Sequence, residues 1–223
     1  MLTTLALVGA LLTTPQADKW DIKTAVAPKA SATWDVSADV VAPDGDHHAA
    51  FKLVIEVKDT EKDKPLQSTY SWKELVLDSG QGMPDNSWDV KIDAQGGITG
   101  TEATEGGDAL RKMLIPMTFL YPDKAVGVGD AWTNTLKSES EKDDHSITVD
   151  FKVEAAEKLG DVDVLKITEK FTEKGPDGMT GTGTWWVDKA GKPQKFEVKA
   201  NRWVVPMAGT DSMDATLKGT LAK

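Results

Sequence analysis

The chain has 223 residues, a formal net charge of −10 and no cysteine. An acidic surface repels phosphate backbones, so no nucleic-acid partner is expected. The missing thiols exclude disulfides, cysteine nucleophiles, thiolate zinc sites and a lipid-bearing cysteine. Hydrophobic residues make up 39% of the chain and charged residues 28%, which supplies a normal core and argues against wholesale disorder.

The first 17 residues have the pattern of a secretory signal. An uninterrupted apolar run covers residues 5–12, and the small residue Ala17 precedes the first charged residue. The run is too short to span a bilayer, which needs ~20 residues, but it has the length of a signal h-region. Two features depart from that pattern: no Lys or Arg precedes the run, and a proline lies near the cleavage site. A buried N-terminal strand is the alternative.

The expected organisation is therefore a signal peptide over residues 1–17, cleaved after Ala17, and a single β-rich domain over residues 18–223. We expect the protein to be exported, to the periplasm or outside the cell. No later segment is apolar and long enough to cross a membrane.

Alternation of apolar and polar residues dominates the chain past the leader. It is clearest in residues 32–42, 50–59, 87–93, 146–155 and 195–203. Such a pattern predicts strands with one dry face and one wet face, which belong to antiparallel sheets. Turn sequences rich in Asp, Gly and Pro separate these segments at the spacing of hairpins. The predicted fold is mainly β, with about ten strands in a curved antiparallel sheet or half-barrel.

One segment, "TEGGDALRKMLIPMTFLY" at residues 104–121, breaks the alternation. Apolar residues recur there at helical spacing: Leu110, Met113, Leu114, Met117 and Tyr121. Thr104 or Asp108 is a candidate N-cap, and Pro116 should end or kink the helix near Ile115. We predict one short amphipathic helix that packs its Leu and Met stripe on the curved sheet.

The stretch Gly127-Val128-Gly129-Asp130 raises the question of a phosphate-binding loop. A dinucleotide-binding fingerprint would need a third glycine where Trp132 stands, and a helix where the sequence reads as a strand. We therefore predict a turn that leads into a strand and buries Trp132.

Metal and catalytic motifs are weak. His47 and His48 lie beside Asp44, but adjacent residues on a strand point to opposite faces, and the twelfth position of an EF-hand loop would be Ile55. The acidic stretch with a histidine at residues 143–145 is weaker still. The sequence has three histidines and no G-x-S-x-G motif. No catalytic residue, metal or cofactor is predicted, and the protein is not expected to be an enzyme. A calcium ion held by loop carboxylates stays open as an alternative.

Tryptophan is unusually frequent, with eight residues against five phenylalanines and two tyrosines. These rings either fill the core or line a ligand groove. The candidate ligand-binding residues are Met113, Met117, Trp132, Trp185 and Trp186. Because Trp185 and Trp186 are adjacent on a strand, one should face inward and the other outward, and the outward ring is the best single candidate for a binding surface.

Two segments carry a resemblance to a known group. "FLYPDKAVGVGDAWTNTL" at residues 119–136 contains a proline followed by Val-x-Val-Gly-Asp-x-Trp, and "WWVDKAGKPQKFEV" at residues 185–198 is an aromatic hairpin with a glycine turn. Both resemble segments of an uncharacterised family of exported bacterial domains that are similar to the lipoprotein-carrier (LolA-type) half-barrel. The resemblance implies a curved antiparallel sheet wrapped around helix and no catalytic residues. The single helix expected here departs from that group.

The predicted function is that of an exported non-catalytic protein that binds an apolar small molecule or lipid in the concavity of the sheet. The alternatives are a structural or protein-interaction module of the cell envelope and, as a third class, a hydrolase. An enclosed apolar cavity would favour the ligand-binding function, and a filled interior would favour the interaction module. Clustered carboxyls or histidines with raised pKa values would favour the hydrolase.

Overall fold

The computed structural model describes residues 18–22, 30–43, 45–58, 66–101, 107–137, 146–205 and 212–222. The predictions about the signal peptide, the Thr104 cap, Asp44 and residues 143–145 lie outside these residues.

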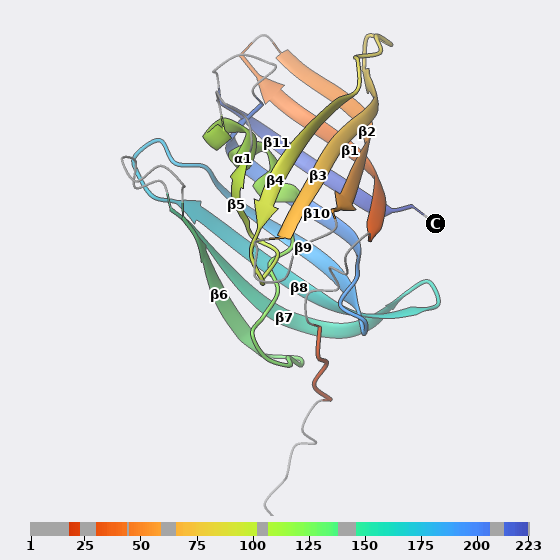
Figure 1. Cartoon of the computed structure of the whole chain (residues 1–223), viewed down its shortest axis with the longest axis vertical. Coiled ribbons are helices and arrows are strands. Elements are labelled where there is room, and N and C mark those ends of the chain that lie inside the picture. Colours follow the sequence, from red (N-terminus) through yellow and green to blue (C-terminus); the bar gives the residue numbers. More distant parts are fainter. Residues whose placement is uncertain are drawn as a thin grey trace, which may run out of the picture.

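Eleven strands of the described chain form one antiparallel sheet, which confirms the mainly β prediction (Figure 1). They are β1 (Ser31–Ala42), β2 (Gly45–Val57), β3 (Leu66–Leu77), β4 (Asn86–Ile92), β5 (Ile98–Thr101), β6 (Ala131–Leu136), β7 (Ile147–Leu159), β8 (Val162–Glu173), β9 (Thr180–Asp188), β10 (Pro193–Val204) and β11 (Ser212–Leu221). Their order across the sheet is β5-β4-β3-β2-β1-β11-β10-β9-β8-β7-β6. Only the β1–β11 pair joins strands distant in the sequence, so short hairpins build most of the sheet.

The alternation that predicted the strands also sets which side chains face inward. On β1, Trp34, Val36 and Ala38 are buried, whereas Asp35 and Asp39 are exposed. The sheet curls around its apolar face and encloses the helical segment, as Figure 1 shows. The result is a nearly closed, barrel-like sheet with its core inside the curl, as expected for a half-barrel.

The helical segment is shorter than its apolar stripe. Helix α1 (Gly107–Leu114) ends where predicted, and the 3-10 helix η1 (Ile115–Met117) contains Pro116, which cannot continue an α-helix. Tyr121 therefore lies in the extended chain beyond the helix. Asp108 lies within α1 rather than before it, so it does not occupy the predicted capping position.

The chain after η1 fills the interior and bridges the two edge strands of the sheet. Residues 117–122 are buried. The Tyr121 amide donates a hydrogen bond to the Gln95 carbonyl oxygen, beside β5, at 2.8 Å. The Trp132 indole N–H, on β6, donates to the Leu120 carbonyl oxygen at 3.2 Å. Residues 117–122 thus act as a central plug that holds β5 and β6 against one interior.

The Gly-Val-Gly-Asp stretch is a turn into β6, as predicted. Gly129 has a φ of +91°, which favours glycine. The Gly127 amide donates to Asp130 Oδ2 at 2.8 Å, and Lys19 Nζ lies 3.2 Å from the same oxygen. Both contacts stabilise the carboxylate and hold the pKa of Asp130 below its ordinary value.

Candidate functional site

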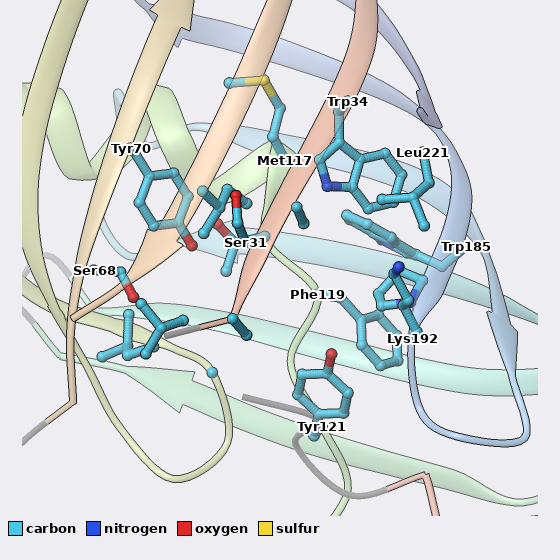
Figure 2. Close-up of a pocket in the computed structure, with 18 residues that line it drawn as sticks. Ser31, Trp34, Ser68, Tyr70, Met117, Phe119, Tyr121, Trp185, Lys192 and Leu221 are labelled. Atoms are coloured by element: carbon cyan, nitrogen blue, oxygen red, sulfur yellow. The ribbon is translucent and has the colours of Figure 1, made fainter. Parts of the chain in front are cut away.

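The inner face of β1–β3 is separated from the plug by a cavity of about 340 Å³, which we call the main cavity. Its walls come from β1, β2 and β3 on one side, and from η1, the plug and Trp185 of β9 on the other (Figure 2). Ligand sites in proteins commonly measure ~300–1,000 Å³, so the main cavity reaches the lower part of that range.

One wall of the main cavity is aromatic. The Phe119 ring centroid lies 4.9 Å from that of Tyr121 and 5.5 Å from that of Trp185. Trp34 of β1 lies beyond Trp185, and Phe196 contacts both rings, at 5.4 Å and 4.9 Å. Rings that pack edge-to-face and tilted in this way form a rigid apolar surface.

The opposite wall carries hydroxyl groups. Ser68 and Tyr70 lie two residues apart on β3 and therefore share its inner face. Ser68 is fully buried, and its hydroxyl has no hydrogen-bond partner among the described residues. Figure 2 shows both hydroxyls directed toward the interior, across from Trp34 and Trp185.

The other buried hydroxyls of the lining, on Tyr70 of β3 and on Thr118 and Tyr121 of the plug, are neutral groups. Thr118 Oγ1 donates to the Leu114 carbonyl oxygen at 2.9 Å. Burial raises the pKa of Tyr70 to about 12, and a hydrogen bond with Thr118 offsets part of that rise. Burial also raises the pKa of Tyr121, so both phenols stay protonated near neutral pH.

Charge is nearly absent from the lining. Among the described lining residues, Lys192 is the single one with a charged side chain, and it lies exposed on the turn between β9 and β10. The interior of the main cavity is therefore apolar and aromatic, with uncharged hydroxyls on the β3 side.

The structure brings two of the five predicted binding residues, Met117 and Trp185, to the main cavity. Met113 is fully buried, and its carbonyl oxygen accepts a hydrogen bond from the Trp203 indole at 3.0 Å. Trp132 is half-buried on β6 and stacks on Phe151 at 4.8 Å. Met113 and Trp132 therefore lie in the packing around the plug rather than in the cavity lining.

Trp186 faces the outer side of the sheet, as alternation predicts, but its ring is covered. The Trp186 indole N–H donates to Glu157 Oε1 at 2.7 Å, and Lys195 Nζ lies 4.5 Å from the ring centroid. The residue is only 9% exposed. It presents little apolar surface, because Glu157 of β7 and Lys195 of β10 lie against it.

Sequence reasoning missed the hydroxyl wall. The signal lies in the stretch "QSTYSW", residues 67–72, where Ser68 takes an inward position that alternates with Tyr70 and Trp72. A serine at such a position marks a polar group inside an apolar layer. Which side chains it would face depends on the position of the plug, which the local pattern does not specify.

A second cavity, of about 290 Å³, lies at the other end of β1–β3. Its lining is almost wholly apolar, with Val40, Phe51, Leu75 and Trp203 among its residues. The indole N–H of Trp72, which also lines it, is buried and has no partner among the described residues.

The two adjacent histidines lie at the rim of this second cavity, and both are exposed. His48 Nδ1 lies 2.7 Å from Asp39 Oδ1 on the outer side of the sheet. Within the described ranges, no group of three or more His, Asp and Glu side chains is arranged to hold a metal ion.

Two carboxyl groups are buried on the inner face of β8. Glu173 lies 2.6 Å from Lys112 Nζ of α1 and accepts a hydrogen bond from the Met179 amide at 2.8 Å, so it ties the helix to the sheet. Glu169 lies over Gly183 of β9, and burial raises its pKa to about 8, with the Trp185 side chain offsetting part of the rise. Neither carboxyl lines the main cavity.

Among the described residues, no helix is both long and apolar enough to cross a membrane.

Comparisons with known proteins yield no family. No family model and no curated protein matches the sequence. Among solved structures, the chain is similar to a protein with a YmcC-like fold from Bacteroides fragilis, with 12% identity, a TM-score of 0.37 and coverage of 88% of this chain and 98% of that one. It is also similar to the hypothetical lipoprotein YmcC from Escherichia coli, with 16% identity, a TM-score of 0.38 and coverage of 89% of each chain.

A third similar structure is a β-barrel-like protein of a domain of unknown function from Brucella abortus, with 12% identity, a TM-score of 0.37 and coverage of 86% of this chain and 95% of that one. Likenesses this weak carry no argument about what this chain binds or does. They do not confirm the resemblance to the lipoprotein-carrier group.

Proposed function

We propose that this protein is an exported, non-catalytic binding protein that holds a small apolar ligand in the main cavity. The observation that supports this most is the main cavity itself, about 340 Å³ between a rigid aromatic wall and the inner face of β1–β3. The main cavity is partly open to solvent and its lining is mostly apolar and aromatic, which is typical of sites that bind small molecules.

The non-catalytic part of the proposal rests on the chemistry of the lining. The buried polar groups there include hydroxyls, and the phenols of Tyr70 and Tyr121 have raised pKa values, so they stay protonated near neutral pH and are not available as general bases. None of the described lining residues is a histidine or a carboxylic acid. The buried Glu169 lies outside the described lining of the main cavity.

Export is proposed from the apolar leader alone. Cleavage after Ala17 would leave a mature chain that begins at Asp18. Fractionation of the source cells, followed by N-terminal sequencing of the protein from the envelope or the medium, tests this part. An intact leader on cytosolic protein would overturn it.

Native mass spectrometry of protein purified from its own cells tests binding. We expect a mass above that of the bare chain, released on denaturation as one class of small apolar molecule. Bare protein mass in several preparations would argue for the alternative, a protein-interaction module.

A matched pair of variants locates the ligand. Ala32 is half-buried on the inner face of β1 and lines the main cavity, whereas Ala50 is exposed on the outer face of β2. The Ala32→Phe ring should fill the cavity and weaken binding of an uncharged fluorescent probe, N-phenyl-1-naphthylamine, by more than about tenfold, equivalent to ~1.4 kcal/mol. Ala50→Phe should leave binding unchanged. If both variants weaken probe binding equally, the ligand does not bind in the main cavity.

A further inference from the structure

We propose that the ligand of the main cavity is an uncharged amphiphile whose polar group is a hydroxyl, bound between Ser68 and Tyr70 of β3. This inference rests on the proposed function and narrows it from an apolar ligand to a chemical class. Three observations on the described residues support it: polar groups on β3 line the cavity, one of them has no hydrogen-bond partner, and the lining has no buried charged group.

Ser68 supplies the first observation. Its side chain is 0% exposed and faces the main cavity, yet its hydroxyl has no hydrogen-bond partner among the described residues. A buried hydroxyl without a partner costs ~1–3 kcal/mol, so a folded protein retains one where something else supplies the partner. A ligand oxygen next to Ser68 Oγ would accept its hydrogen bond.

Tyr70 supplies the second observation. It lies two residues along the same face of β3, roughly 6.6 Å from Ser68 in the strand direction. Its side chain also lines the main cavity, and Figure 2 shows its hydroxyl directed toward the interior. A phenol can donate or accept a hydrogen bond, so Tyr70 can pair with a ligand hydroxyl in either direction.

A ligand hydroxyl suits both groups, because one hydroxyl can accept a hydrogen bond from Ser68 and donate one to the Tyr70 oxygen. An ether or ester oxygen would only accept. A carboxylate would enter a wall of hydroxyls with no buried cation to compensate it, since Lys192 is exposed on the β9–β10 turn. Burying an unpaired charge costs far more than burying a hydroxyl that is hydrogen-bonded.

The apolar part of the ligand would lie against the aromatic wall. Figure 2 shows Trp34, Phe119 and Trp185 across the cavity from the two β3 hydroxyls. The ligand would therefore be oriented, with its hydroxyl toward β3 and its hydrocarbon toward β9 and the plug.

The test uses three probes of one chain length: 1-decanol, decane and decanoate at neutral pH. Each competes with N-phenyl-1-naphthylamine for the full-length protein. Wild type should bind decanol more tightly than decanoate. Ser68→Ala should weaken decanol about three- to tenfold, the effect of one hydrogen bond, and leave decane unchanged. Tyr70→Phe should weaken decanol again without affecting decane.

Ser71→Ala is the matched control, since Ser71 is also buried on β3 but faces the other side of the sheet. It should leave all three affinities unchanged. Thermal unfolding of Ser68→Ala checks the fold, and its melting temperature should not fall, because the change removes a hydroxyl that lacks a partner.

Different results separate the two proposals. Two results would overturn the hydroxyl assignment: Ser68→Ala weakens the binding of decane as much as that of decanol, or it weakens neither. In both cases the proposal that the protein binds an apolar ligand would stand. If decanoate binds more tightly than decanol, an anionic head group replaces the hydroxyl. If none of the probes binds wild type, both the proposed function and this inference fall.

Discussion

Strands β8–β11 and strands β1–β3 enclose the same interior, but they fill it differently. On the β8–β11 side, glycines on one strand lie beneath large side chains of the next. A Cβ at Gly181 would overlap the Phe171 ring, and one at Gly219 would overlap the Phe196 ring. On the β1–β3 side, the small residues Ala32 and Ser68 face the main cavity instead of a neighbouring ring.

The contrast shows that small residues do opposite things in this fold. On the packed side a small residue makes room for a ring from the adjacent strand, and the space is filled. On the hollow side the small residues border the main cavity, and the space beside them stays open. The same change of side-chain volume should therefore have different consequences on the two sides.

The largest expected effect comes from removing a ring on the packed side. Phe171 of β8 is 1% exposed and covers Gly181, so Phe171→Ala should lower the free energy of unfolding by about 3–5 kcal/mol. The comparison is Ile55, which is half-buried at the main cavity. Ile55→Ala should lower the free energy of unfolding by clearly less, about 2 kcal/mol or below. Urea denaturation measures both. Equal losses would contradict the division into a packed and a hollow side.

The next effect is the pH dependence that buried Glu169 introduces on the packed side. Its pKa is about 8 in the folded chain, against an ordinary value of 4.5. The folded state therefore keeps a proton that the unfolded state releases between these values. The free energy of unfolding should fall as pH rises from about 4.5 to about 8, by at most ~1.4 kcal/mol per pH unit, and level off above.

Glu169→Gln keeps the shape of the side chain and removes its titration. Over that pH range the variant should gain stability relative to wild type by a few kcal/mol, on the order of the pKa shift. Urea denaturation at about pH 5, 7 and 9 measures the difference, in which the titrations shared by both proteins cancel. Parallel pH profiles would show that Glu169 does not titrate in this window.

A smaller effect follows from adding one methyl group to the packed side. Gly219→Ala should cost about 1–3 kcal/mol, because its Cβ would overlap the Phe196 ring, which Trp34 and Trp185 hold in place. A melting curve of this variant that matches wild type would show that the ring can move aside.

The smallest effect is expected from adding volume to the hollow side. Ala32→Leu puts three more carbons into the main cavity and should change the free energy of unfolding by less than about 1 kcal/mol, since no close-packed neighbour opposes it. A loss as large as that of Gly219→Ala would mean that the main cavity closes in solution.

Local pattern was enough to predict the strands and the end of the helix. The face of each inward residue on β1 and β7 follows from alternation, because successive side chains of any strand point to opposite sides. Pro116 ended α1 at Leu114 for an equally local reason, its missing N–H and its ring. Met117 and Trp185, two of the five residues predicted to bind a ligand, line the main cavity.

Only the tertiary structure decided which inward residues meet. The hydroxyl wall at Ser68 and Tyr70 became a candidate site because the curl of the sheet sets it across from Trp185, far away in the sequence. Trp186 is not an exposed ring, because Glu157 of β7 and Lys195 of β10 cover it. Alternation specifies a side of the sheet, whereas contacts across the interior depend on strand order, curvature and the position of the plug, which are properties of the whole chain.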